Sequence, residues 1–212
     1  MTSLPPLAAQ AASLSALAMQ PSPERAVSPL NGLGEDVDAF WASAIDAKRR
    51  SMGRYSVFGA SGFIVPHPLA LRVGIAGFSR PDFDREQTER VLRAVFFSLA
   101  RQWAPQSASR VTVVAGLTDV GISSIGYRLA EELGWRTRGV ASLQAFGHPW
   151  FPVDRALLSG SRWGDESQAF IGQIDAFVRV GGGHIARNEE KMARDRHLPT
   201  LAFEAESGPL FA

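Results

Sequence analysis

Short apolar runs alternate with segments of helical periodicity over the last two-thirds of the chain, and this alternation restricts the fold more than any other feature. The apolar runs are residues 71–78, 111–116, 135–142, 174–180 and 199–204. Apolar residues of segment 84–103 recur at three- and four-residue spacings, which is typical of a helix that buries one face. Strands that alternate with helices form βαβ units and a parallel sheet.

The connections between these strands restrict the order of the sheet. Because crossovers between parallel strands are right-handed, few topologies remain. We predict an α/β fold with a doubly wound, Rossmann-like parallel sheet of about five strands, in the order 3-2-1-4-5, with an N-terminal helical extension. Strands one and four are then neighbours, and a ligand crevice is expected at this switch point, beyond the carboxyl ends of the strands.

The part of the chain before residue 71 differs in composition. It begins with an Ala-, Ser- and Pro-rich segment that predicts a flexible leader. Residues 14–19 are mildly apolar but lack a basic start, so a secretory signal is not indicated, although a targeting or export role stays open. A helix is expected over residues 36–50, followed by a hairpin or an irregular arm. The predicted leader, helix with arm, Rossmann-like domain and tail are residues 1–35, 36–70, 71–206 and 207–212.

The composition excludes several classes of function. A net charge of +1 gives no electrostatic case for binding nucleic acid. No window reaches the roughly 18 apolar residues of a membrane span, so no membrane contact is expected. The absence of cysteine excludes disulfides, thiolate metal sites and a cysteine nucleophile. It also fits a reducing compartment, and we expect a cytoplasmic protein.

Glycine-bearing loops follow three of the predicted strands and converge on the expected crevice. Gly181, Gly182 and Gly183 end the fourth strand, and a helical pattern containing Glu189 follows them. Backbone N–H groups at such a turn can face an anion, which makes this loop a candidate phosphate site. The alternative is that the glycines serve turn geometry alone. The loops after strands one and two contain Gly77 and Ser79, and Gly116, Thr118 and Gly121.

Several familiar motifs are missing from the sequence. There is no GxxxxGK[ST] phosphate loop, and the first βα turn lacks GxGxxG, so ATP hydrolysis and ordinary NAD binding lose their usual support. The histidines show no metal-ligand spacing, and neither HExxH nor a GxSxG elbow occurs. We therefore expect no metal ion and no cofactor.

Three segments resemble the lonely guy-like, or SLOG, proteins, which have a Rossmann-type fold. VVAGLTDVGISSIGYRLAEELGWRTRGVAS at residues 113–142 is similar to the family's GGxxVGLMGAVADAALAAGGxVIGV. DAFVRVGGGHIARNE at residues 175–189 is similar to its DAFIALPGGxGTxxE, and GIAGFSR at residues 74–80 occupies the place of its first-strand Gly-Ser loop. The resemblance covers about residues 71–204.

The resemblance implies a nucleotide site at the crevice. Some members of the family cleave the N-glycosidic bond of nucleoside 5′-monophosphates, and others only sense nucleotides. By position, Gly182 and Gly183 match the phosphate-binding glycines, and Glu189 matches the acidic residue that would serve the glycosidic carbon. Related proteins commonly dimerise through helices that flank the sheet, so a possible homodimer is also implied. The other residues that match or adjoin the family's site are Gly77, Ser79, Arg80, Gly116, Thr118, Gly121, Gly181 and His184.

The sequence departs from the family pattern in two places. Ile185 and Ala186 stand where the family has Gly-Thr, which removes a hydroxyl from the phosphate loop. The family's Arg-Lys pair, whose arginine takes part in catalysis, has no match, because residues 165–167 at that spacing read DES. Arg162, with Arg155 as a second choice, is the nearby candidate for the role of that arginine.

Residues 161–167 have two possible interpretations, and so does Glu189. Residues 161–167 bind sugar hydroxyls in one interpretation, whereas in the other Trp163 is packing and Asp165 caps a helix. Glu189 is either a carboxylate that stabilises an oxocarbenium-like state or a solvated first-turn residue favoured by the helix dipole. We expect a nucleotide-binding protein that hydrolyses an N-glycosidic bond, with a non-catalytic sensor or an interaction protein as the alternatives.

Overall fold

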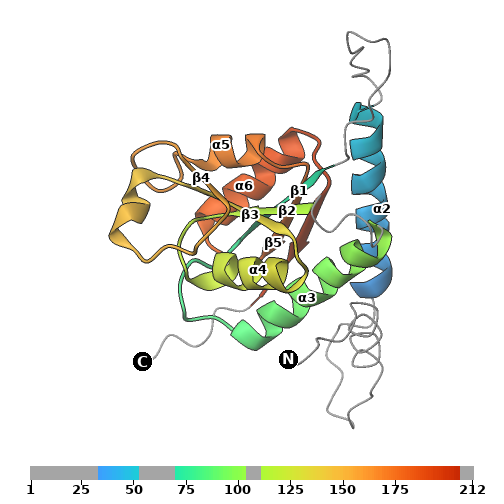
Figure 1. The fold of residues 1–212 in the computed structure, drawn as a ribbon, viewed down its shortest axis with the longest axis horizontal. Helices are drawn as coiled ribbons and strands as arrows, with labels where there is room; N and C mark the ends of the chain where they lie inside the picture. The colour runs from blue at the N-terminus through green and yellow to red at the C-terminus, as the bar shows by residue number, and fades with distance from the viewer. Residues whose placement is uncertain (1–32, 53–69, 104–110, 206–212) are drawn as a thin grey trace, which may run out of the picture. The chain divides into compact units, whose positions relative to one another are not determined.

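The computed structural model of the chain describes residues 33–52, 70–103 and 111–205. Most of the predicted leader and arm, and the whole predicted tail, lie outside the described residues. Within them, helices cover both faces of a parallel sheet (Figure 1).

The sheet contains six parallel strands in the order β4-β3-β2-β1-β5-β6. The strands are β1 (Leu71–Gly77), β2 (Val111–Ala115), β3 (Arg136–Ala141), β4 (Arg155–Leu158), β5 (Ala176–Val180) and β6 (Thr200–Phe203). The five predicted strands are present in the predicted order, which makes β1 and β5 neighbours. β4 is an additional edge strand that the apolar pattern does not reveal, because its residues are largely exposed. The prediction of about five strands is therefore one strand short.

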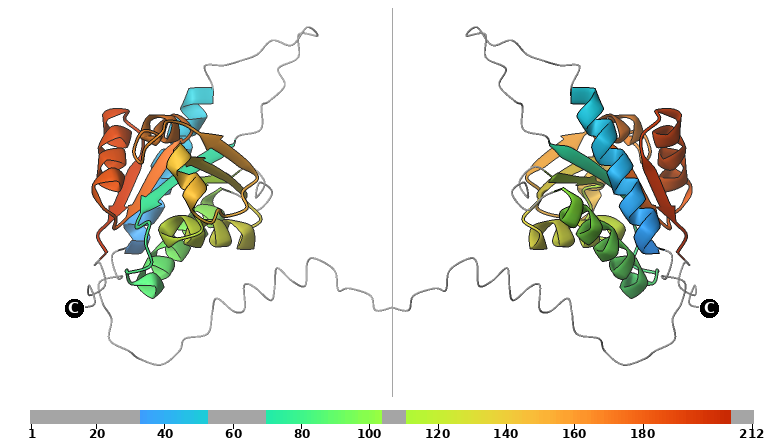
Figure 2. Two further views of the ribbon diagram at one scale, coloured as in Figure 1. Left: turned by 90° about the vertical axis from the view of Figure 1, so that its left-hand side faces the viewer. Right: turned by 90° about the vertical axis from the view of Figure 1, so that its right-hand side faces the viewer.

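Helices of two groups lie on opposite faces of this sheet. They are α2 (Leu33–Met52), α3 (Arg85–Gln102), α4 (Gly121–Glu132), α5 (Ser167–Gly172) and α6 (His184–Asp195), with a 3-10 helix η3 (Leu143–Gly147). α2, α3 and α4 lie on one face, and α5 and α6 on the other (Figure 1 and Figure 2). α2 and α3 correspond to the helices predicted over residues 36–50 and 84–103. Of the described helices, none is long and apolar enough to cross a membrane.

Alternate residues of each central strand contribute to two apolar cores. Val73 and Ile75 of β1 belong to the core under α2, α3 and α4, whereas Ala76 belongs to the core under α5 and α6. Because both faces of the sheet are covered, the central strands appear in the sequence as continuous apolar runs instead of an alternating pattern.

α2 is attached to the domain through its apolar side and through polar contacts with α3 and with Asp175. The indole N–H of Trp41 donates to the carbonyl oxygen of Val95 in α3 at 2.8 Å. Lys48 Nζ lies 3.0 Å from Asp175 Oδ1, which also accepts from Arg72 Nη2 at 2.9 Å. Burial opposes the ionisation of Asp175, but its hydrogen bonds and charge contacts with Arg72 and Lys48 lower its pKa. This ion cluster lies at the amino-terminal ends of β1 and β5 and leaves their carboxyl ends free for a site.

Candidate functional site

A cavity of about 640 Å³ lies where the loops after β1, β2 and β5 meet, at the carboxyl ends of these strands. Residues from the connections after β3 and β4, from α5 and from α6 complete its wall. Doubly wound sheets bind ligands at this position, and the volume is within the usual range for small-molecule sites. The cavity therefore occupies the predicted switch point between β1 and β5.

Backbone packs directly on backbone where β1 and β5 end. Gly182 has a φ of +92°, and a Cβ atom there would lie 2.7 Å from the carbonyl carbon of Gly77. A Cβ atom on Gly77 would lie 2.2 Å from the carbonyl oxygen of Val180. Only glycine permits this approach, so these two glycines join the two loops.

The loop after β2 is joined to the loop after β1 in a similar way. Ile122 N donates to Phe78 O at 2.8 Å, and a Cβ atom on Gly121 would lie 1.9 Å from the same oxygen. The hydroxyl of the buried Tyr127 lies 3.0 Å from the carbonyl oxygen of Gly116. The loops that form the mouth of the cavity are therefore held against one another by backbone contacts.

The first turn of α6 presents backbone N–H groups at the cavity. The first intrahelical hydrogen bond runs from Arg187 N to Gly183 O at 3.1 Å. The residues between them, His184, Ile185 and Ala186, line the cavity and have N–H groups without a partner inside the helix. Gly183 supplies no side-chain cap, and a Cβ atom there would meet no atom within 4 Å. With the positive end of the helix dipole, this open helix end can bind an anion.

Two arginines line the cavity near this helix end. Arg80, in the loop after β1, is half exposed, and its Nε lies 3.0 Å from Asp82 Oδ1. Arg187 pairs with Glu204, with 3.2 Å between Nη2 and Oε2. Both guanidinium groups contribute to a field that attracts anions.

Two buried glutamates line the same cavity. Glu166 and Glu189 are each 8% exposed, and no Lys, Arg or His among the described residues forms an ion pair with either. Ser167 Oγ donates to Glu189 Oε1 at 2.9 Å, and Gly164 N donates to Glu166 Oε2 at 2.8 Å.

The environment of these glutamates disfavours their ionised forms. Burial raises the pKa of Glu189 to about 7; the Ser167 hydrogen bond opposes this shift, and the negative charge of Glu166 adds to it. Burial also raises the pKa of Glu166. Glu189 can therefore gain or lose a proton near neutral pH, which is the property of a general acid or base.

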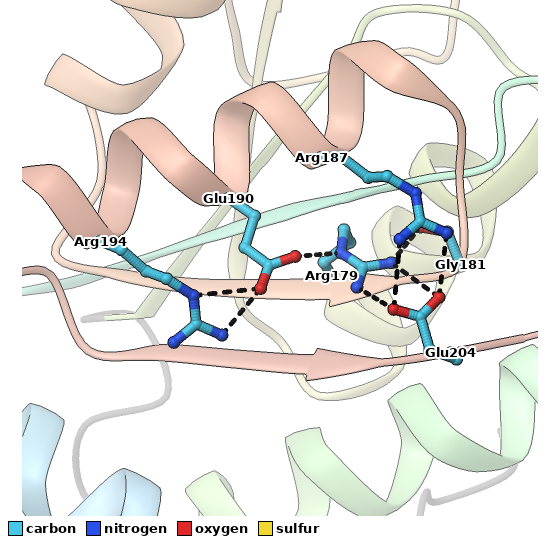
Figure 3. A network of polar contacts seen from close by, with 6 residues as sticks. All are labelled: Arg179, Gly181, Arg187, Glu190, Arg194 and Glu204. Atoms are coloured by element: carbon cyan, nitrogen blue, oxygen red, sulfur yellow. Dashed lines mark hydrogen bonds and ion pairs between the residues drawn. The ribbon is translucent and has the colours of Figure 1, made fainter.

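Glu190, the next residue along α6, lies in a different environment (Figure 3). Arg179, buried in β5, donates from Nε to Glu190 Oε2 and from Nη2 to Glu204 Oε1, both at 2.5 Å. Arg179 Nη1 donates to Gly181 O at 2.9 Å, and Arg194 Nη2 donates to Glu190 Oε1 at 2.7 Å. This network fixes the first glycine after β5 and the rotation of α6 about its axis.

The turn before α5 places Glu166 in the cavity wall but not Arg162. Asp165 Oδ2 accepts hydrogen bonds from the backbone nitrogens of Ser161 at 3.0 Å and Arg162 at 2.9 Å. These bonds lower the pKa of Asp165, and the bond from Arg162 has the larger effect. Asp165 thus organises the turn and caps no helix. Arg162 is exposed and does not line the cavity, so the arginine expected at the site is not there.

Most of the other predicted site residues meet in the cavity wall. Gly181 and Gly121 lie behind the wall, where a Cβ atom on Gly181 would be 2.2 Å from the ring of Phe78. Among the described residues, no group of three or more His, Asp or Glu side chains is arranged to hold a metal ion. The predicted residues that line the cavity are Gly77, Ser79, Arg80, Gly116, Thr118, Gly182, Gly183, His184 and Glu189.

The sequence prediction included residues 161–167 as a segment that binds sugar hydroxyls, but it singled out neither Glu166 nor the aromatic part of the cavity wall. Trp163 is 43% exposed and lines the cavity, and its ring centroid lies 5.8 Å from that of His148. A bridge between Thr118 and Trp150 holds this connection against the loop after β2. The available signal was a long connection rich in Trp and His, since long loops in compact domains are often functional. The sequence does not indicate which of its side chains turn toward the crevice.

Comparisons with known proteins leave the family open. No family model matches this chain, and no curated protein matches it either. A solved structure of the molybdenum cofactor carrier protein from Chlamydomonas reinhardtii is 18% identical, with a TM-score of 0.46 over 63% of this chain and 76% of that chain. A second structure of that carrier is 19% identical, with a TM-score of 0.48 over 65% and 77%. The structure of TM1055 is 17% identical, with a TM-score of 0.49 over 61% and 72%. At these values the similarity identifies no family and no function.

Proposed function

We propose that this protein binds a nucleotide-like ligand in the cavity between β1 and β5, with a phosphate group against the amino terminus of α6. The observation that carries the proposal is the open helix end, whose N–H groups at residues 184–186 lack an intrahelical partner and line a cavity of suitable size. Arg80 and Arg187 beside it favour an anionic ligand. The motifs that resemble those of the lonely guy-like proteins favour a nucleotide.

We further propose that the ligand is a substrate whose N-glycosidic bond is hydrolysed. The reaction passes through an oxocarbenium-like state that a carboxylate stabilises, and the departing base needs a proton. Glu189, with a pKa of about 7, populates both its ionised and its protonated form at neutral pH. Phosphate binding at α6 would position the sugar, because remote binding energy can orient a reacting centre.

A non-catalytic nucleotide sensor is the second candidate. Ile185 and Ala186 line the cavity where catalytic relatives have Gly-Thr, and Arg162 does not reach it. A sensor would bind the same ligand in the same place but release no base. The homodimer implied by the resemblance also stays a proposal, which light scattering would test.

Thermal unfolding with nucleotides and nucleosides tests the binding proposal. A ligand that binds the native state raises Tm, and AMP and other nucleoside 5′-monophosphates should raise it more than the same nucleosides without phosphate. If no nucleotide raises Tm, the proposal is wrong.

Chromatographic detection of free base separates the enzyme from the sensor. If the wild type releases base, Glu189→Gln should slow release by about 100-fold or more, because it removes the proton-transferring group. Glu131→Gln, on an exposed part of α4, is the matched control and should leave the rate unchanged. Equal rates in all three proteins would show that Glu189 is not the catalyst.

A further inference from the structure

Glu166 and Glu189 bring two buried carboxyl groups to one cavity without a cation to compensate them. The partly buried Asp175, in contrast, has such partners in Arg72 and Lys48. A buried, unpaired carboxylate costs free energy. The two groups are therefore neutralised by a proton or by a group that enters the cavity.

Each of these carboxyl groups has one oxygen held by the protein and one left over. Ser167 Oγ donates to Glu189 Oε1, and Gly164 N donates to Glu166 Oε2. Glu189 Oε2 and Glu166 Oε1 receive no hydrogen bond from any other described residue, and the Glu166 carboxyl has one further contact, with its own backbone N–H. Because both side chains line the cavity, these two oxygens are acceptors that it offers to a ligand.

We propose that Glu166 and Glu189 together bind a planar nitrogen cation, or paired N–H donors, of the ligand, such as the amidine-like edge of an amino-substituted heteroaromatic base. Carboxylates accept such groups through short, charge-assisted hydrogen bonds. The exposed ring of Trp163 in the same wall gives a flat group a surface for stacking. The inference rests on the proposed binding of a nucleotide-like ligand, since both use one cavity, and it favours the sensor over the hydrolase, because a Glu189 carboxylate that is ionised against the base has no proton to give to a leaving group. It adds that the ligand has an anionic end at α6 and a nitrogen-donor end at the two glutamates.

Binding at this site exchanges a proton for the ligand. Without ligand, the two carboxyl groups retain a proton near neutral pH, and an incoming cation favours the form in which both are ionised. Binding should therefore release a proton and become tighter between about pH 6 and about pH 8. His148 and His184 also line the cavity, so variants of the glutamates are needed to assign the effect. The other charged groups at the cavity are Arg80 and Arg187, and Asp165 adjoins Glu166.

Two probes separate the two ends of the site. Benzamidinium is a planar amidinium without phosphate, and ribose 5-phosphate is a phosphorylated sugar without a base. Calorimetry in two buffers of different ionisation enthalpy measures affinity and proton release together. We expect benzamidinium to bind the wild type with release of a proton. Glu166→Gln and Glu189→Gln should each weaken it about tenfold or more, whereas Glu131→Gln should leave it unchanged.

The outcomes distinguish this inference from the proposed function. If benzamidinium fails to bind, binds the glutamine variants as well as the wild type, or binds without releasing a proton, the inference is wrong. Absence of proton release by the wild type contradicts the inference without any variant, whereas a released proton is assigned to the two glutamates by its loss in Glu166→Gln or Glu189→Gln. Binding of ribose 5-phosphate alone would leave the phosphate site standing and remove the nitrogen-donor site. Binding of benzamidinium alone would do the reverse.

Discussion

Glu189 and Glu190 are neighbours on α6, yet they lie in opposite electrostatic environments. Glu190 lies between Arg194 and Arg179, whose hydrogen bonds lower its pKa against the effect of burial (Figure 3). Glu189 lies in the cavity wall with Glu166 and without a cation, and burial raises its pKa to about 7. One step along the helix thus separates a carboxylate that is compensated by the fold from one that is not.

This difference separates the groups that hold the fold together from those that are open to a ligand. In the network around Arg179, each charge faces an opposite charge, and the loop after β5 is fixed through the carbonyl oxygen of Gly181. In the cavity, two carboxyl groups face a space large enough for a ligand. Carboxyl groups without a compensating cation in a cleft are typical of functional sites. Their burial lowers the stability of the fold, so packing alone does not explain their presence.

The largest expected effect comes from breaking the compensated region. Arg179→Met should lower the free energy of unfolding by about 3–5 kcal/mol, because it removes the buried guanidinium group that pairs with the partly buried Glu190. Arg93→Met is the control, because it removes a much more exposed arginine that also pairs with two glutamates and should cost less than about 1 kcal/mol. Urea unfolding measures both, and equal losses would contradict the distinction between the two regions.

Removing the uncompensated carboxyl group of Glu189 should raise the stability of the protein instead of lowering it. The pKa of Glu189 rises from 4.5 to about 7 on folding, so the folded state binds the proton more tightly and stability falls as pH rises through this interval. Glu189→Gln should therefore match the wild type near pH 4 and exceed its stability by about 3 kcal/mol near pH 8. Urea unfolding at the two pH values measures the difference, and a loss of stability near pH 8 would contradict the account.

Glu190→Gln is the matched control for that experiment. Because folding lowers the pKa of Glu190, its contribution to stability is present above the unfolded pKa and disappears as pH falls through the folded pKa. The variant should therefore be less stable than the wild type near pH 8, and the difference should shrink toward low pH. If both substitutions change stability in the same direction, the two glutamates do not differ as we describe.

The glycines after β5 allow the same comparison at the level of the backbone. Gly182→Ala should cost about 2 kcal/mol, because its φ is +92° and its Cβ atom would meet the backbone of Gly77. Gly183→Ala should cost less than about 1 kcal/mol, because its Cβ atom would meet nothing within 4 Å. Thermal unfolding of both variants is the measurement. A larger loss for Gly183→Ala would mean that the open helix end is part of the packing.

The smallest effect is expected at the exposed edge of the cavity. Arg80→Met should leave stability within about 0.5 kcal/mol of the wild type, because the side chain is half exposed. It should weaken ribose 5-phosphate roughly fivefold, as expected for loss of one solvent-exposed cation near a phosphate. Calorimetry measures the affinity for ribose 5-phosphate, and an unchanged affinity would show that Arg80 does not contact the phosphate.

The order of the sheet could be predicted because the five predicted strands appear as apolar runs of the right length, with helices between them. β4 could not be predicted, since an exposed edge strand such as Arg155–Leu158 needs no apolar run. The open end of α6 was also predictable, because glycines that follow a strand and precede a helix place N–H groups at the switch point.

The arrangement of charges could not be read from the sequence in the same way. The adjacent pair Glu189 and Glu190 is visible, but the side that each faces depends on Arg179, which is hidden in an apolar run. Glu166 reaches the cavity through a turn organised by Asp165, and Arg162 is excluded from it by the same turn. These positions depend on individual hydrogen bonds and ion pairs, which leave no periodic pattern in the sequence.

The most direct test of the central claim is a titration of the ¹⁵N-labelled protein with ribose 5-phosphate, followed through the backbone amide signals. We predict saturable shifts concentrated at residues 183–186, where the amides at the start of α6 line the cavity, with little change around Arg179. Shifts located elsewhere, or no saturation at millimolar concentrations, would contradict a phosphate site at this helix end.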